Sequence, residues 1–243
     1  MLLSFLAGGD IREIIIGILL TIPVVLISLS VHEAAHGYVA MKLGDPTAYN
    51  LGRVTLNPFK HLHPLGALCM LVFGYGWANP VPINARNFKN PKVGMALSSI
   101  AGPVSNIILG IIGAVVFTAT DIIRITVIIT GGTIPSAVAI VVEIFLQFCL
   151  YFGLMNFMLA AFNMIPVPPF DGSRFFSLFL PQKWYFAIMK YERIVMVVVL
   201  VGIIILSRVF NFSPFSWVAE KLFFGISNPI YQLFLLILSN VVA

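Results

Sequence analysis

Two histidines and a glutamate lie close together early in the chain, in the order His32-Glu33-Ala34-Ala35-His36. This order matches the pattern H-E-x-x-H, in which residues four apart share one face of a helix. Both imidazoles can then reach one Zn²⁺ at about 2.0 to 2.1 Å. Glu33 lies beside the metal without being a ligand, so it can accept a proton from a zinc-activated water. The pattern predicts metal-assisted hydrolysis.

The location of this pentapeptide supports the metal interpretation over a chance match. A lone histidine on an apolar face is more often a packed core residue than a ligand. The pentapeptide, however, ends the apolar run of residues 14–31. Ionisable groups at lipid depth are costly, so a cluster of them there is by default a functional site.

A third ligand has to come from elsewhere in the chain, because a catalytic zinc site ordinarily has three protein ligands and one open position. Asp171 is the predicted third ligand. It follows the proline-rich residues 163–170, which end a helix, and it precedes Gly172. A carboxylate at that position projects from the helix end.

The composition indicates that these elements lie in a membrane. The chain has 243 residues, of which 60% are hydrophobic and 9% charged, whereas soluble domains carry about 25% charged residues. The net charge of +5 is spread between apolar runs without interleaved aromatics, so no nucleic-acid partner is expected. Cys69 and Cys149 are isolated in apolar stretches, which argues against a disulfide or a cysteine zinc site.

The apolar runs predict an all-α polytopic membrane protein, integral to the cell membrane, with about five transmembrane helices. A sixth run, residues 65–77, is shorter and contains two glycines, so it is expected to be re-entrant or interfacial. Alternating polar and apolar residues at 49–58 predict a short strand or hairpin. The five longer runs are residues 14–31, 93–119, 134–164, 194–206 and 229–242.

No repeat or shift in composition marks a domain boundary. One membrane protease domain is therefore expected over residues 1–243, with a catalytic core at about 12–175 and C-terminal helices at about 190–243.

Basic residues set the expected orientation, because cytoplasmic loops of membrane proteins are enriched in Lys and Arg. Both flanks of residues 65–77 are basic, so both are expected in the cytoplasm. Ten of the fourteen basic residues then lie on that side, and the N-terminus lies outside. An even number of crossings separates His36 from Asp171, so the two meet near the cytoplasmic face.

The chain resembles the site-2 protease family, in the compact form without an inserted PDZ domain or appended CBS domains. The resemblance covers most of the chain. It rests on five motifs in order, which are HEAAH (32–36), TLNPFKHLHPLG (55–66), GWANPVPIN (76–84), AGPVSN (101–106) and NMIPVPPFDG (163–172).

The resemblance implies an intramembrane zinc metalloendopeptidase that cleaves membrane proteins in or near their transmembrane helices. It assigns one Zn²⁺ per chain to His32, His36 and Asp171, and the acid/base role to Glu33. It also implies that Asn163 steadies the substrate carbonyl or its oxyanion.

Other residues of the matching motifs are less closely defined. Asn106 is either a substrate-binding amide or a helix-packing amide. For His61 and His63 a surface or substrate-contact role is favoured over zinc ligation. Ser173 stands where the family often has a second glycine, and only a local packing difference is expected from it.

Two other functions use the same residues. A membrane metal transporter could bind its ion at His32, His36 and Asp171, although the chain lacks the paired inverted repeats typical of such proteins. A catalytically inactive member could bind membrane helices as a regulator, but such a module has no need of Glu33 as a base.

Overall fold

The computed structural model describes residues 11–66, 78–181, 191–209 and 212–242. All regular elements within these residues are helical, which confirms the predicted all-α class. The α-helices are α2 (Ile11–Lys42), α3 (Thr47–Asn50), α5 (Pro91–Ile129), α6 (Ser136–Asn163), α7 (Asp171–Phe176), α9 (Glu192–Val209) and α10 (Pro214–Val242), and the 3-10 helices are η1 (Pro58–Lys60) and η2 (Ala85–Asn87).

Four of the described helices are long and apolar enough to cross a membrane. The structure differs from the predicted five spans in the C-terminal part of the chain, where α10 alone among the described helices is long and apolar enough to cross a membrane. The predicted run 229–242 is the second half of α10, whose first half contains the charged pair Glu220 and Lys221. The predicted run 194–206 lies in α9, where the apolar stretch Ile194–Ile203 is shorter than a span. The four candidate spans are Ile15–Lys42, Pro91–Ile129, Ser136–Asn163 and Pro214–Ser239.

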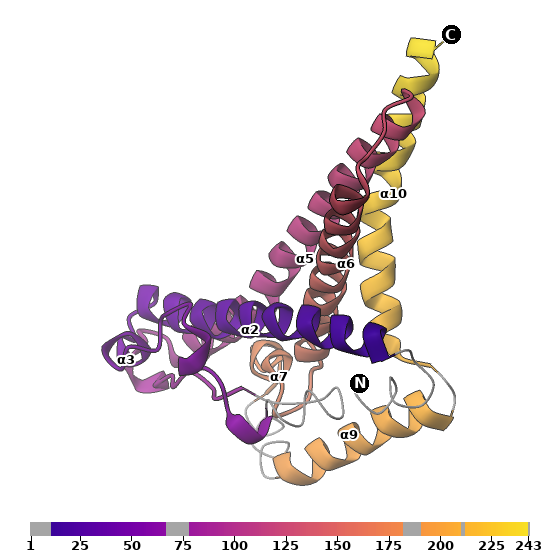
Figure 1. Ribbon diagram of the computed structural model, residues 1–243. Coiled ribbons are helices and arrows are strands. Elements are labelled where there is room, and N and C mark those ends of the chain that lie inside the picture. The colour runs from indigo at the N-terminus through magenta and orange to yellow at the C-terminus, as the bar shows by residue number, and fades with distance from the viewer. Residues whose placement is uncertain (1–10, 67–77, 182–190, 210–211, 243) are drawn as a thin grey trace.

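Helices α5, α6 and α10 pack along one another as a bundle (Figure 1). A Cβ on Gly113 of α5 would lie 2.8 Å from the Cα of Gly153 of α6, and one on Gly153 would lie 2.7 Å from Cδ2 of Phe223 of α10. Phe223 is buried against Ala114 and Phe157. Small residues at such contacts allow membrane helices to approach closely.

Helix α2 runs across the ends of α5 and α6 nearest α7, rather than alongside them (Figure 1). It contacts both α5 and α6, and α7 packs against α5. The crossing brings the HEAAH segment of α2 to the first half of α5, and the short helix α7 adds Asp171 at the same place. Three segments far apart in the sequence therefore meet at one point.

The strand or hairpin predicted at residues 49–58 is wrong. Helix α3 ends in a turn at Gly52, whose φ of +63° is the left-handed conformation that favours glycine. Asn57 then caps η1, since its side-chain oxygen accepts a hydrogen bond from the N–H of Phe59 at 3.1 Å. This turn and capping chemistry outweighs the polar and apolar alternation on which the prediction rested.

The re-entrant segment predicted at residues 65–77 lies almost wholly outside the described residues. Its flanks are described, and an antiparallel bridge joins Leu62 to Ala78. The N–H of Asn79 also donates to the carbonyl of His61 at 2.7 Å. The two described flanks of the segment therefore lie side by side.

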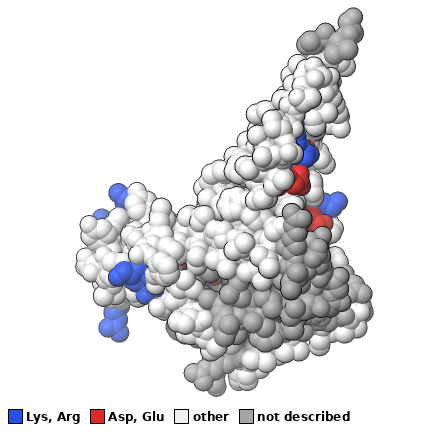
Figure 2. All heavy atoms as spheres, viewed as in Figure 1, with Lys and Arg blue, Asp and Glu red and all other residues white. Residues whose placement is uncertain are grey.

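Most of the charged side chains visible in Figure 2 lie in two regions. Several basic ones lie at the end that carries α3, and a mixed group of acidic and basic ones lies partway up the bundle. In that bundle, Arg124 of α5 contacts Asp121 at 2.5 Å and Glu143 of α6 at 3.1 Å. The hydroxyl of Tyr231 of α10 donates to Asp121 at 2.6 Å. This network links the three helices and gives Glu143 a structural partner.

Candidate metal centre

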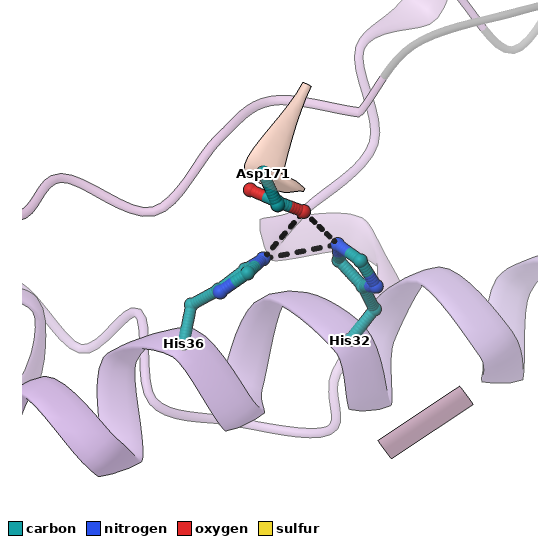
Figure 3. Close-up of side chains that lie close together, drawn as sticks. All are labelled: His32, His36 and Asp171. Carbon is teal, nitrogen blue, oxygen red and sulfur yellow. Dashed lines mark hydrogen bonds and ion pairs between the residues drawn. The ribbon is translucent and has the colours of Figure 1, made fainter. Parts of the chain in front are cut away.

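Three predicted ligand atoms converge where α2, α5 and α7 meet (Figure 3). Nε2 of His32 lies 3.0 Å from Nε2 of His36. Oδ2 of Asp171 lies 3.2 Å from the first nitrogen and 3.3 Å from the second. Both histidines are buried, and Asp171 keeps a side-chain exposure of 19%. The cluster is thus mostly enclosed by protein but remains accessible at Asp171.

This triangle fits a zinc ion. Ligand atoms bound to one tetrahedral Zn²⁺ at about 2.0 to 2.1 Å lie about 3.3 Å from one another, close to the three observed separations. Two imidazole nitrogens and one carboxylate oxygen are ligands that zinc accepts, and three of them leave a fourth position open for water. The arrangement suits a catalytic site better than a structural one.

The other ring nitrogen of each histidine points away from the triangle (Figure 3). Nδ1 of His36 lies 2.7 Å from the carbonyl oxygen of Ser98, and Nδ1 of His32 lies 2.5 Å from Oδ1 of Asn106. A carbonyl oxygen only accepts, so the Nδ1 of a neutral His36 carries the proton. Its Nε2 lone pair then faces the centre. Such outer hydrogen bonds fix the tautomer of metal-binding histidines.

Asp171 is the first residue of α7, where a carboxylate is favoured by the helix dipole. The start of this helix packs tightly on the end of α6. A Cβ on Gly172 would lie 2.5 Å from the carbonyl carbon of Met164 and 2.6 Å from the carbonyl oxygen of Ile165. The glycine therefore allows the approach that brings Asp171 to the histidines.

The electrostatics of Asp171 favour its ionised form. Burial alone would raise the pKa of this carboxyl, but the charge on His36 and the hydrogen bonds to both imidazoles outweigh burial and hold the pKa below its usual value. An ionised carboxylate beside two imidazoles is neutralised either by a proton on an imidazole or by a metal ion. The negative charge of Asp171 therefore favours the binding of a cation at this site.

Glu33 is buried, and one of its oxygens has a protein partner. The N–H of Val81 donates to Oε2 at 2.8 Å. No described residue donates to Oε1, which leaves that oxygen available for a proton. The bond to Val81 also attaches the extended segment after residue 78 to helix α2 beside the metal centre.

The same segment is held a second time by Asp45, which lies in the turn between α2 and α3. This buried carboxylate accepts hydrogen bonds from the N–H of Asn84 at 2.6 Å, from Nδ2 of Asn87 at 2.7 Å, and from Thr47. Burial alone would raise the pKa of Asp45, but these donors outweigh it and hold the pKa below its usual value. The carboxylate is therefore ionised at neutral pH and keeps the segment in place.

The absence of a side chain at Gly102 makes room for the two imidazoles. A Cβ at this position of α5 would lie 2.5 Å from Cε1 of His36 and 2.6 Å from Cε1 of His32. Both separations are well inside van der Waals contact. Gly102 therefore allows α5 to pack against the ligand face of α2.

The remaining predicted site residues differ in how exposed they are and in what they bond to. Asn163, the last residue of α6, is partly exposed, and its Nδ2 donates to its own helix at the carbonyl of Leu159 (3.1 Å). Asn106 is fully buried and bonds to His32 and to Asn156, which fits the packing alternative better than substrate binding.

His61 is buried and bonds through Nε2 to the carbonyl of Thr55 at 2.8 Å. Neither His61 nor His63 belongs to the three-residue cluster.

The sequence did not predict two residues near the centre, Gly102, which lies against both histidines, and Asn156, which bonds to Asn106. Gly102 stands inside the AGPVSN motif, but its contact with both imidazoles depends on how two distant helices cross. Asn156 is a lone amide within the apolar run 134–164. Polar groups at membrane depth are expensive and so draw attention to themselves. That signal could have identified Asn156.

Known proteins resemble this chain over the region that contains the site. Residues 20–208 match the sequence model of the family described as Peptidase family M50. This range includes His32, Glu33, His36, Asn163 and Asp171. No solved structure matches the chain.

Two curated relatives carry provisional names as zinc metalloproteases. YwhC of Bacillus subtilis (strain 168) is 42% identical over 156 residues, which cover 64% of this chain and 67% of the relative. Rip2 of Mycolicibacterium smegmatis (strain ATCC 700084 / mc(2)155) is 29% identical over 117 residues, which cover 45% of each protein.

Proposed function

Because the chain belongs to peptidase family M50, the site-2 protease family, we propose that it cleaves other membrane proteins in or near their transmembrane segments. The chain is a zinc metalloendopeptidase with helices that can cross a membrane. In this proposal, His32, His36 and Asp171 hold one Zn²⁺ per chain. The observation that carries it is the convergence of these three residues within an uncharged stretch of the molecule.

The depth of the site supports cleavage within the membrane. Helix α5 has no charged residue between Lys92 and Asp121, a length of about 42 Å at 1.5 Å per residue. That exceeds the bilayer's hydrocarbon core of about 30 Å. Ser98 and Asn106, which contact the two histidines, lie about 9 and 21 Å from Lys92 along the helix. The site therefore lies inside the uncharged stretch, nearer its basic end.

We also propose an orientation for the protein, which the distribution of its basic residues supports. Several basic side chains lie at the end that carries α3 (Figure 2), and cytoplasmic segments of membrane proteins are enriched in Lys and Arg. We place this end, and the active site near it, at the cytoplasmic face. The N-terminus then lies outside.

Glu33 moves the proton in the proposed reaction. When bound, Zn²⁺ lowers the pKa of a water molecule to about 7 and polarises a carbonyl group. Oε1 of Glu33 accepts the proton of the water while Val81 holds Oε2. The water oxygen bonds to the carbonyl carbon, the C–N bond breaks, and Oε1 returns the proton to the leaving nitrogen. Both hydrogens of the water end on the products.

Asn163 is proposed to bind the substrate carbonyl. One N–H of its amide is used by the carbonyl of Leu159, which leaves the second to donate to the oxygen that gains charge. A substrate helix has to unwind first, because its carbonyls are hydrogen-bonded within the helix. The proposed substrates are therefore membrane proteins whose transmembrane helices unwind locally.

The experiment that tests this function compares one cleavable sequence in two settings. The protein is reconstituted in liposomes with a reporter whose scissile segment lies near the cytoplasmic end of a transmembrane helix. The same segment is also supplied as a soluble peptide outside the liposomes. We expect zinc-dependent cleavage of the membrane reporter, at least about ten times faster than that of the soluble peptide, because the site lies within the uncharged stretch.

Chelation of zinc, followed by zinc addition, provides the control for metal dependence. Equal cleavage of the two reporters would refute the intramembrane location while leaving the peptidase activity intact. Zinc transport without cleavage of either reporter would favour the metal-transporter alternative.

A further inference from the structure

A chain of buried hydrogen bonds runs from His32 across three helices. Nδ1 of His32 in α2 bonds to Oδ1 of Asn106 in α5 at 2.5 Å. Nδ2 of Asn106 donates to Oδ1 of Asn156 in α6 at 2.8 Å. Nδ2 of Asn156 donates to Oγ of Ser28 at 2.9 Å and to the carbonyl of Phe152 at 2.8 Å. Ser28, Asn106 and Asn156 are all 0% exposed.

The carbonyl of Phe152 sets the direction of every bond in this chain. A backbone carbonyl only accepts, so the atom of Asn156 that faces it is the amide nitrogen. The other atom of Asn156 is then its oxygen, and it faces the amide nitrogen of Asn106. Asn106 accordingly presents its oxygen to His32. An imidazole nitrogen that faces an oxygen acceptor has to carry a proton, so Nδ1 of His32 is the donor.

The two proposed histidine ligands obtain their orientation in different ways. Nδ1 of His36 donates directly to a backbone carbonyl, that of Ser98. Nδ1 of His32 faces an amide, and an amide presents either an oxygen or a nitrogen depending on how it is turned. The tautomer of His32 therefore depends on Asn106, and the orientation of Asn106 depends on Asn156. The tautomer of His36 does not depend on a side chain, because its Nδ1 faces a backbone carbonyl.

We propose that Asn156 is a positioning residue for zinc: through Asn106 it keeps the proton of His32 on Nδ1, so that the Nε2 lone pair is presented to the metal. This inference rests on the proposed function, since it requires His32 to be a zinc ligand. Asn156 itself touches neither the ligand triangle nor the substrate. Two hydrogen bonds separate it from His32, one from Asn106 to Asn156 and one between His32 and Asn106.

A purely structural role for the two amides makes a different prediction. Amides that bond across membrane helices also hold them together, and in that case the loss of Asn156 lowers thermal stability without changing how the folded protein binds zinc. Ser28 separates the two roles. It bonds to Asn156 but does not set its orientation, because the carbonyl of Phe152 already does.

The test uses Asn156→Leu, with Ser28→Ala as the matched control. Zinc affinity is measured for each reconstituted protein by competition between Zn²⁺ and a chromophoric chelator. Loss of an outer hydrogen bond to a metal-binding histidine weakens metal affinity by about 10- to 100-fold, and we expect this for Asn156→Leu. Ser28→Ala is expected to bind zinc within about twofold of the parent protein. The thermal midpoint of each zinc-free protein is recorded alongside.

A second measurement does not depend on whether a variant folds. Imidazole ¹⁵N chemical shifts of His32 in the zinc-free parent protein report which ring nitrogen carries the proton. We expect Nδ1. An Nδ1 of His32 without a proton would overturn the proposal, as would parental zinc affinity in folded Asn156→Leu. Failure of the proposed function is distinct, because the parent protein itself would then bind no zinc or cleave no reporter.

Discussion

Replacing Glu33 with Gln is expected to lower the rate of peptide hydrolysis by about 10²- to 10⁴-fold, the usual contribution of a general acid or base. Gln has nearly the same shape, and its amide oxygen can still accept the hydrogen bond from Val81. It cannot take a proton from water at neutral pH. Zinc affinity should stay close to that of the parent protein, because Glu33 is not one of the three converging residues. Cleavage of the membrane reporter and zinc titration provide the two measurements.

The matched control for this prediction is Glu143→Gln. Glu143 is paired with Arg124 in the bundle, outside the three-residue cluster, so this variant should retain most of the parental rate. Parental activity in Glu33→Gln would remove Glu33 as the base. Loss of zinc from Glu33→Gln would instead assign Glu33 a role in holding the metal.

The second large effect is expected for Gly102→Ala. The added methyl group would meet Cε1 of both His36 and His32 at 2.5 to 2.6 Å, so at least one imidazole has to move. Displacements of about 1 Å at a catalytic site cost about 10²-fold in rate. We expect at least that loss in reporter cleavage, together with weaker zinc binding in the chelator competition.

Gly225→Ala is the matched control, because a Cβ at Gly225 of α10 would meet nothing within 4 Å. It makes the same chemical change in a membrane helix without a steric conflict. Parental zinc affinity and rate in Gly102→Ala would contradict the packing of α5 against the imidazoles described above.

The long helices were predictable because apolar runs of about 20 residues have few alternatives in a membrane. The limits of α10 were not, because Glu220 and Lys221 interrupt its hydrophobicity while leaving its helical geometry unchanged. The predicted strand at residues 49–58 failed for a local reason. Gly52 and Asn57 carry turn and capping chemistry that a period-two pattern does not register.

In the candidate site too, residues related by local spacing were predictable, whereas residues brought together by helix packing were harder to predict. His32, Glu33 and His36 are related by helical spacing, which the sequence states directly. Asp171 required a topological argument, and the structure brings it to the two histidines. Gly102 and Asn156 depend on how α2 crosses α5 and α6, and neither spacing nor composition encodes that crossing. Residues whose function depends on helix packing were therefore the ones missed.

X-ray absorption at the zinc edge, recorded on the purified parent protein and on Asp171→Ala, tests the central claim most directly. The parent protein is expected to hold one zinc per chain, with nitrogen and oxygen ligands at about 2.0 to 2.1 Å and an imidazole signature. Asp171→Ala is expected to lose most of this zinc. Sulfur ligands in the parent spectrum, or an unchanged zinc content and spectrum in Asp171→Ala, would contradict a site made by His32, His36 and Asp171.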